Sequence, residues 1–402
     1  MAAPGYSFGW PRAGEGGAGP SLDPRLVFVM ARSDSPRVGL VLGAGGIMGG
    51  AWITGGLEAL ATETGWDPAS ADRVVGTSAG SMMGALLVSG VPPWFMVAHS
   101  AGRTFQGLAG ADGRPAATAS RSGGAQFRYA GGLPPIGPGS WRLIANSLRS
   151  PGSHRPAALL AGWLPRGPIS TEPIKETIRR VVPHGWTDHP SFWAVACDYT
   201  DGHRVAFGRE NAPEADLADA VAASCAIPGF YEPVTIAGRR YIDGGLWSTS
   251  NLDILRNEAL DLVICLNPTS SLHPPHAWNP VERLAGLARR GSGRRLGSER
   301  KKLVAAGTEV VLIQPTDEDH EAMGPNLMST RNRNSVIRTA IRTVREQLLA
   351  PEVAGFLRDL PPGPDYKIRE PDGPPSEWPD TLPGVRRRTA AARGESSRAA
   401  EA

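Results

Sequence analysis

The chain has 402 residues, of which 41% are hydrophobic and 20% charged, so it carries enough apolar sequence for a sizeable core. Its 42 basic and 39 acidic residues give a net charge of +3 and are spread along the sequence, which gives no support to nucleic-acid binding. Because no apolar run approaches the roughly 20 residues that span a bilayer and no export signal is recognised, we expect a cytoplasmic protein, with peripheral contact to a membrane as an open alternative.

Residues 1–35 are rich in Gly, Pro and Ser, and we predict a disordered tail. The fold begins with a strand-length apolar run, 38–42, which enters a glycine cluster and is followed by a helix-compatible stretch, 53–64. This order places a bare backbone turn at a helix N-terminus, where free N–H groups and the helix dipole favour a negative charge. Two anions suit such a loop, a nucleotide phosphate and the oxyanion of an acyl-transfer transition state, and the loop alone does not decide between them.

A second strand, glycine turn and helix follow at 73–75, 76–80 and 81–88, an order typical of parallel βαβ units. The turn has the pattern Gly-x-Ser-x-Gly, in which small neighbours let a serine project from the edge of a sheet with a helix N-terminus behind it. Ser78 is therefore a candidate nucleophile. The alternative is a tight turn that contains a serine by coincidence.

From 107 to 168 the regular pattern is lost in favour of Gly, Pro, Ser and Arg. A stretch of this length inside a domain predicts either a functional lid or a disordered insertion. Two apolar islands interrupt it, at 141–144 and 159–164. They fit an apolar lid that touches membrane lipid, and they fit equally a piece of core beneath a loop.

Regular patterns return in the second half of the chain. Helices are predicted at 171–182, 216–225, 279–306 and 330–349, and strands at 191–197, 204–207, 239–242, 261–266 and 309–313. The last two strands are continuous apolar runs, which is typical of a parallel sheet covered on both faces. The scattered cysteines, Cys197, Cys225 and Cys265, lie in apolar contexts and are expected to be buried free thiols. Beyond 361 the composition predicts a second disordered tail, 361–402.

A serine hydroxyl needs a base before it can act as a nucleophile, and the usual base is histidine. Three histidines stand in loops without a supporting motif: His273, His276 and His320. A carboxylate is the other candidate, because Asp243 ends the strand at 239–242. It would lie at the same sheet edge as Ser78 if the two strands are parallel, whereas the ordinary interpretation of Asp-Gly is a turn.

Three segments in this order resemble the patatin-like phospholipase family. They are the loop Gly43-Ala44-Gly45-Gly46-Ile47-Met48-Gly49, the turn Gly76-Thr77-Ser78-Ala79-Gly80 and the motif Asp243-Gly244-Gly245. Further similarity runs from Ala223 to Asn251. The resemblance implies a three-layer α/β/α fold with a mainly parallel central sheet, in one domain over about 36–350 that contains the insertion or lid at about 107–168.

The resemblance also implies a serine acyl hydrolase of the phospholipase A or lipid acyl hydrolase type, with a Ser–Asp dyad. Ser78 would attack the ester carbonyl, and Asp243 would accept its proton and later activate water. The oxyanion would be bound by backbone N–H groups of Gly45, Gly46 and Ile47. The glycines that support the motifs are Gly43, Gly49, Gly76, Gly80, Gly244 and Gly245. No EF-hand-type loop is present in the sequence, and we expect no metal and no cofactor, with a lipid or acyl ester as the partner.

Two positions depart from the family pattern. Met48 stands where the family commonly carries Arg or Lys, and Ala44 stands where it carries glycine. Loss of the basic side chain removes a charge that would steady the loop or an anionic substrate, whereas the backbone donors survive both changes. The pattern suits a neutral or zwitterionic acyl ester as well as a phospholipid.

Two alternatives stay open. One is a non-catalytic protein of the same fold that binds lipid or a partner. The other is a dinucleotide-binding oxidoreductase, since the loop is similar to the Gly-x-Gly-x-x-Gly fingerprint. In that case the third glycine is expected at 48, which is Met48, and the acidic residues that follow, Glu63 and Asp67, lie in or just after the helix.

Overall fold

The computed structural model describes residues 35–101, 108–110, 127–131, 136–149, 161–189, 191–271, 280–363 and 385–387. The disorder predicted for 1–35 and 361–402 falls almost entirely outside these ranges. So do large parts of the predicted insertion at 107–168. The fold below is that of the described residues from 36 onward.

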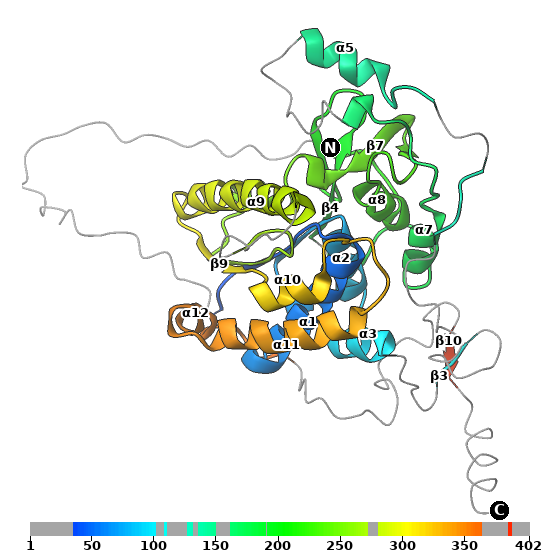
Figure 1. Cartoon of the computed structure of the whole chain (residues 1–402). Coiled ribbons are helices and arrows are strands. Elements are labelled where there is room, and N and C mark those ends of the chain that lie inside the picture. The colour runs from blue at the N-terminus through cyan, green and yellow to red at the C-terminus, as the bar shows by residue number, and fades with distance from the viewer. Residues whose placement is uncertain are drawn as a thin grey trace, which may run out of the picture. The chain divides into compact units, whose positions relative to one another are not determined.

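An eight-stranded sheet forms the centre of the fold, in the order β6-β7-β4-β2-β1-β8-β9 with β5 also paired to β4 (Figure 1). The strands are β1 (Val38–Leu42), β2 (Arg73–Thr77), β4 (Phe192–Asp198), β5 (Arg204–Phe207), β6 (Val234–Ile236), β7 (Arg239–Asp243), β8 (Leu262–Leu266) and β9 (Glu309–Ile313). The pairings among β4, β2, β1, β8 and β9 are parallel, and those of β5, β6 and β7 are antiparallel. The predicted α/β fold with a mainly parallel sheet is therefore confirmed.

Helices cover both faces of this sheet. They are α1 (Gly46–Thr64), α2 (Ala79–Val88), α3 (Pro93–Ser100), α5 (Trp141–Arg149), α7 (Glu172–Arg179), α8 (Leu217–Ser224), α9 (Pro280–Val304), α10 (Asp317–Met323), α11 (Arg333–Leu349) and α12 (Pro351–Leu357). Single 3₁₀ turns lie at η1 (Pro68–Ser70), η2 (Gly244–Leu246) and η3 (Leu252–Leu255), and a separate two-stranded sheet pairs β3 (Leu108–Gly110) with β10 (Val385–Arg387). Figure 1 shows α9 on one side of the sheet and α1, α10 and α11 on the other, which gives three layers.

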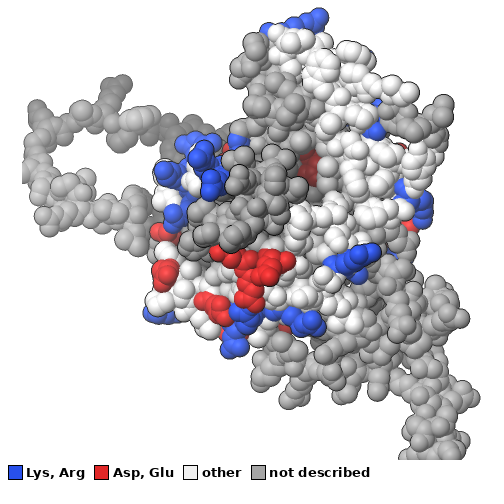
Figure 2. Space-filling view, in the orientation of Figure 1, with Lys and Arg blue, Asp and Glu red and all other residues white. Residues whose placement is uncertain are grey.

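Several of the shorter elements are not among those predicted from the sequence. One of them, α10, begins with a capping box in which Thr316 and Asp319 exchange hydrogen bonds. Its first turn is acidic, which suits the positive end of the helix dipole, and Figure 2 shows acidic side chains gathered over this part of the molecule. The helices α3 and α12 and the strand β6 were likewise too short for a periodic pattern to single them out.

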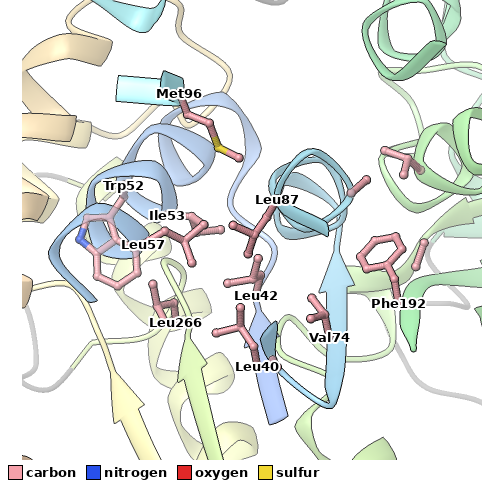
Figure 3. Close-up of a cluster of buried hydrophobic side chains, with 14 of the residues drawn as sticks. Leu40, Leu42, Trp52, Ile53, Leu57, Val74, Leu87, Met96, Phe192 and Leu266 are labelled. Atoms are coloured by element: carbon pink, nitrogen blue, oxygen red, sulfur yellow. The ribbon is translucent and has the colours of Figure 1, made fainter. Parts of the chain in front are cut away.

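The core follows from the alternation of side chains along the strands. Leu40 and Leu42 of β1 point to one face of the sheet and pack with Trp52 and Leu57 of α1 (Figure 3). Val41, between them, points to the other face and belongs to the cluster under α9. Both faces of the central strands are therefore buried, as their continuous apolar sequences predict.

Helix α1 begins at Gly46, well before the predicted start at 53. Glycine is a poor helix former, so propensity alone does not favour this early start. The early part of the helix is held by contacts with distant segments: the Met48 N–H donates to the carbonyl of Leu327 over 3.0 Å, and a Cβ atom on Gly49 would lie 3.0 Å from Cγ of Pro268. Tertiary contact thus overrides local propensity, and the glycine-rich loop leads straight into a helix N-terminus.

Two further expectations concern the chain as a whole. The three cysteines are free and buried, as predicted. Within the described ranges, no helix combines the length and the apolar character needed to cross a membrane.

Candidate active site

Ser78 occupies the turn between β2 and α2 and is almost fully buried, with 3% of its surface exposed. Its backbone lies at φ 54° and ψ −122°, a region that costs a non-glycine residue about 1–3 kcal/mol. Two contacts hold this strained turn. A Cβ atom on Gly80 would overlap the carbonyl oxygen of Leu42, so only glycine lets α2 approach β1 so closely. The Ser78 N–H donates to Oγ of Ser224 over 2.9 Å.

Asp243 lies next to Ser78, but the strand that carries it has a different orientation from the one expected. Strand β5 takes one side of β4, so β2 and β7 share the other side. In this register Thr77 pairs with Val195, and Asp243 pairs with the next residue, Ala196. The parallel orientation considered for the strand of Asp243 is therefore wrong: β7 is antiparallel to β4, and β2 and β7 run toward each other. Their carboxyl ends meet head to head, which brings Ser78 and Asp243 together.

The carboxylate of Asp243 is buried, with 6% exposed, and accepts two hydrogen bonds. One comes from the side chain of Ser78 and the other from the N–H of Gly245, over 2.7 Å to Oδ1. Burial raises the pKa of Asp243 to about 6, because it disfavours the charged form more than the two hydrogen bonds stabilise it. The group is thus ionised at neutral pH and holds a pKa suited to accepting a proton.

Histidine takes no part in this arrangement among the described residues. The interactions that set the pKa of Asp243 are its burial, Ser78 and the Gly245 amide. His320 lies buried on α10, while His273 and His276 lie outside the described ranges.

The backbone amides of the glycine-rich loop differ in whether they donate a hydrogen bond. The flanking amides all donate to backbone carbonyls: Gly43 to Leu266, Ala44 to Thr249, Met48 to Leu327 and Gly49 to Gly45, over 2.7–3.0 Å. By contrast, no described residue accepts a hydrogen bond from the amides of Gly45, Gly46 or Ile47. Three consecutive donors are thereby left at the N-terminus of α1, where the helix dipole also favours negative charge.

The three loops contact one another directly. Gly80, behind the serine turn, lies against the backbone of Leu42 and Gly43 at the start of the glycine loop. A Cβ atom on Gly245 would lie 3.3 Å from Cβ of Ala44. The structure therefore brings together the serine turn, the carboxylate and the loop with free amides.

Asn251 joins these loops, and the sequence analysis assigned it no role. Its Nδ2 donates to Oγ1 of Thr77 over 3.1 Å, to the carbonyl of Gly244 over 3.4 Å and to the carbonyl of Ser248 over 2.7 Å. Arg204 donates to its Oδ1 over 3.2 Å. The amide thus bridges the residue before Ser78 and the residue after Asp243.

Ser224 is the second residue whose role the sequence did not reveal. Besides accepting the N–H of Ser78, its hydroxyl donates to the carbonyl of Val195 over 2.6 Å. Both Ser224 and Asn251 lie inside the segment Ala223 to Asn251 on which the resemblance was noted. That similarity was the only signal of their importance, since neither belongs to a motif of its own.

The structure shows the surroundings of Met48 and Ala44, the two residues of the glycine loop that depart from the family pattern. The Met48 side chain is buried in the hydrophobic core, so no basic group stands at this position. The backbone amide of Ala44 donates a hydrogen bond to the carbonyl of Thr249. Neither departure changes the three free amides.

The fold and these loops define an α/β protein with a serine on a sharp strand–helix turn, hydrogen-bonded to a buried carboxylate beside a helix N-terminus. The family model of the patatin-like phospholipase matches residues 40–256, more than half of the chain, and the chain belongs to this family. The matched range includes all three loops and Asn251. No curated protein is significantly similar to the chain.

Proposed function

We propose that this protein is a serine acyl hydrolase that cleaves carboxylic ester bonds of lipids. The observation that carries the proposal is the hydrogen bond between Ser78 and Asp243, next to a loop with three amide donors that no described residue accepts from. Family membership supports it, because patatin-like phospholipases are typically serine hydrolases and act on lipids. A dinucleotide-binding oxidoreductase is disfavoured by the same match and by the buried Met48, which stands where the third glycine of the fingerprint is expected.

In the proposed reaction the Ser78 hydroxyl attacks the ester carbonyl while the carboxylate of Asp243 accepts its proton. The negative charge that develops on the carbonyl oxygen is stabilised by the amides of Gly45, Gly46 and Ile47 and by the N-terminal end of α1. Collapse of the tetrahedral intermediate expels the alcohol, which takes up the proton from Asp243, and leaves an acyl group on Ser78. Asp243 then deprotonates a water molecule that attacks the acyl-enzyme, and it returns this proton to the Ser78 oxygen as the fatty acid is released.

Covalent labelling tests the proposal directly. A fluorophosphonate probe should modify Ser78, as identified by mass spectrometry of the labelled peptide, and a panel of acyl lipids should yield free fatty acid. A protein that binds lipid without catalysis would retain lipid binding but give neither labelling nor product.

The pH dependence of the reaction follows from the pKa of Asp243. Only the ionised carboxylate can accept the serine proton, and burial raises the pKa of this group to about 6. We therefore expect kcat/KM to fall tenfold per pH unit well below pH 6, to reach half its maximum near pH 6 and to level off above pH 7. Initial rates on a soluble p-nitrophenyl ester from pH 4.5 to 8.5 measure this profile. A half-maximum near pH 4, the ordinary range of an aspartate, would contradict the proposed environment of the base.

Asn251 is expected to act as a positioning residue for Ser78 and Asp243. Its backbone is left-handed, with φ 52°, so Asn251→Gly removes the side-chain amide at a position where glycine is unstrained. Loss of the bridge between Thr77 and Gly244 should loosen the two catalytic groups and lower kcat by roughly 10- to 100-fold, with little change in KM. Steady-state kinetics measure this split. The matched control is Ala237→Gly, at another left-handed position, which should leave kcat unchanged.

A further inference from the structure

Helix α5 has an inner face that is part of the fold. Leu143 and Ile144 are buried, and Leu143 packs in a cluster with Tyr199 of the turn after β4 and Ile242 of β7. Polar contacts reinforce this attachment: Oγ of Ser140 donates to the carbonyl of Tyr199 over 2.6 Å. Two interpretations were considered for the first apolar island. The one that makes it core beneath a loop is correct for Leu143 and Ile144.

The outer face of α5 is apolar as well, although nothing in the described fold covers it. Trp141 is 66% exposed and Leu148 is 76% exposed, and because seven residues separate them they lie on the same side of the helix. Trp163 is 58% exposed, and its ring lies 6.4 Å from that of Trp141 in an edge-to-face arrangement. Leu164 follows it and is also exposed. We call these four residues, Trp141, Leu148, Trp163 and Leu164, the outer apolar patch.

Basic side chains border the outer apolar patch. Arg142 and Arg149 occur on α5 at the same seven-residue spacing, directly after Trp141 and Leu148. Figure 2 shows basic and uncharged side chains over the region where Figure 1 places α5, whereas the acidic side chains in this view gather near α10. The helix thus combines exposed tryptophan and leucine with arginine, the composition of a segment that lies in a membrane interface.

A pocket of about 420 Å³ opens beside Arg142 of α5. It is lined by Arg142, Thr200, Gly238, Arg239 and Arg240. Arg239 is neutralised by ion pairs with Asp198 and Asp201. Arg142 and Arg240, in contrast, have no carboxylate partner among the described residues. Arg240 donates to the carbonyl of Gly139 over 3.3 Å and lies 5.4 Å from the centroid of the Tyr199 ring, and both of these partners are uncharged. Burial, followed by the nearby charges of Arg166 and Arg142, lowers the pKa of Arg240.

We propose that the outer apolar patch docks the protein on the surface of a bilayer that contains anionic phospholipid, with a headgroup phosphate in the pocket between Arg142 and Arg240. Tryptophan and leucine would enter the interface, and the arginines would lie at the level of the headgroups. The choice of a bilayer as the occupant rests on the proposed function, because a lipid hydrolase must meet its substrate at such a surface.

The position of the patch suits this role. The cluster beneath α5 includes Ile242, the residue before Asp243, and is flanked by Leu246 and Trp247, which follow Asp243 by three and four residues. The docking face is thus packed directly on the segment that holds the proposed base. Docking would bring the candidate active site close to the lipid surface.

Vesicle co-sedimentation tests the proposal without requiring turnover. The full chain carrying Ser78→Ala is mixed with vesicles of phosphatidylcholine alone or with 30 mol% phosphatidylglycerol, at 0.1 and 0.5 M NaCl. We expect binding to the anionic vesicles that weakens at least about tenfold in high salt or without the anionic lipid. Trp141→Ala combined with Leu148→Ala, and separately Arg142→Gln combined with Arg149→Gln, should each weaken binding by at least about tenfold.

Matched controls lie on the far helices. Leu349→Ala with Phe356→Ala removes two other exposed apolar side chains, and Arg338→Gln with Arg358→Gln removes two other exposed basic ones, so neither pair should change vesicle binding. Thermal melts of all variants confirm that they are folded. Equal loss in control and test pairs, or no vesicle binding by the parent chain, would overturn the proposal. The proposal would also be overturned if 20 mM inorganic phosphate abolished vesicle binding and chloride at matched ionic strength did not. The pocket would then select a free anion. Failure of docking, with intact hydrolysis of a soluble ester by the wild-type chain, would leave the proposed function standing.

Discussion

Ser78→Ala is expected to reduce hydrolysis of a p-nitrophenyl acyl ester to the background rate and to abolish labelling by a fluorophosphonate. The substitution removes the only atom proposed to form the acyl-enzyme. Asp243→Asn should lower kcat by at least about 10³-fold, because the amide has nearly the same shape as the carboxylate but cannot take the serine proton. The double variant should be no worse than Ser78→Ala alone, since the two groups act as one unit.

Two controls separate this dyad from other arrangements. Ser224→Ala removes the hydroxyl that holds the Ser78 amide but leaves both reacting groups, so its activity should lie between that of the wild type and Asp243→Asn. His273→Ala with His276→Ala should retain most activity, because the proposed base is a carboxylate. Full activity in Asp243→Asn would exclude Asp243 as the base, and total loss in the histidine pair would point to a Ser-His-Asp triad.

The regular part of the fold could be predicted from local patterns. Continuous apolar runs such as 261–266 and 309–313 correspond to β8 and β9, which lie in the sheet between helical layers. Shorter elements such as α10 could not, because seven residues carry too little periodicity and the element depends on its cap at Thr316. The start of α1 depends on contacts with Leu327 and Pro268, which lie far away in the chain, so no local pattern reveals it.

The candidate site shows the same division. The serine turn and the glycine loop are recognisable as local motifs. Asp243 was a candidate because it ends a strand, and the family resemblance favoured it over an ordinary turn. What the sequence could not supply was the reason that Ser78 and Asp243 meet. That reason is the arrangement of two antiparallel strands, β2 and β7, which share one side of β4 and end against each other. Strand pairing of this kind depends on β5 filling the other side.

The outer face of α5 illustrates a further limit. Its sequence places apolar residues on more than one side of the helix, and the pattern alone cannot tell which side faces the core. The structure separates them, with Leu143 and Ile144 inside and Trp141 and Leu148 outside. The interpretation of the first apolar island as core is therefore confirmed for Leu143 and Ile144, whereas contact of Trp141 with membrane lipid stays a prediction.

The glycine loop permits a direct test of whether its free amides stabilise the oxyanion. Ile47→Pro deletes one of the three unused donors without breaking a hydrogen bond of the described fold. Proline is tolerated in the first turn of a helix, and it disfavours a right-handed helical conformation in the residue before it. Gly46 has φ 59° and so already lies outside that conformation. We expect the variant to fold and kcat to fall by about 10²–10³-fold, the usual effect of losing one oxyanion donor.

Ile47→Ala is the matched control, because it shortens the same half-buried side chain and keeps the amide. It should retain activity within a few-fold of the wild type, and both variants should melt cooperatively in circular dichroism. Fluorophosphonate labelling adds a second measurement, since the probe also develops negative charge on an oxygen in its transition state, and its rate should fall in Ile47→Pro alone. A folded Ile47→Pro variant with unchanged kcat and labelling rate would show that this amide does not contact the reacting oxygen. The oxyanion would then be held by the remaining amides of Gly45 and Gly46 or by the first amides of α2, which begins directly after Ser78.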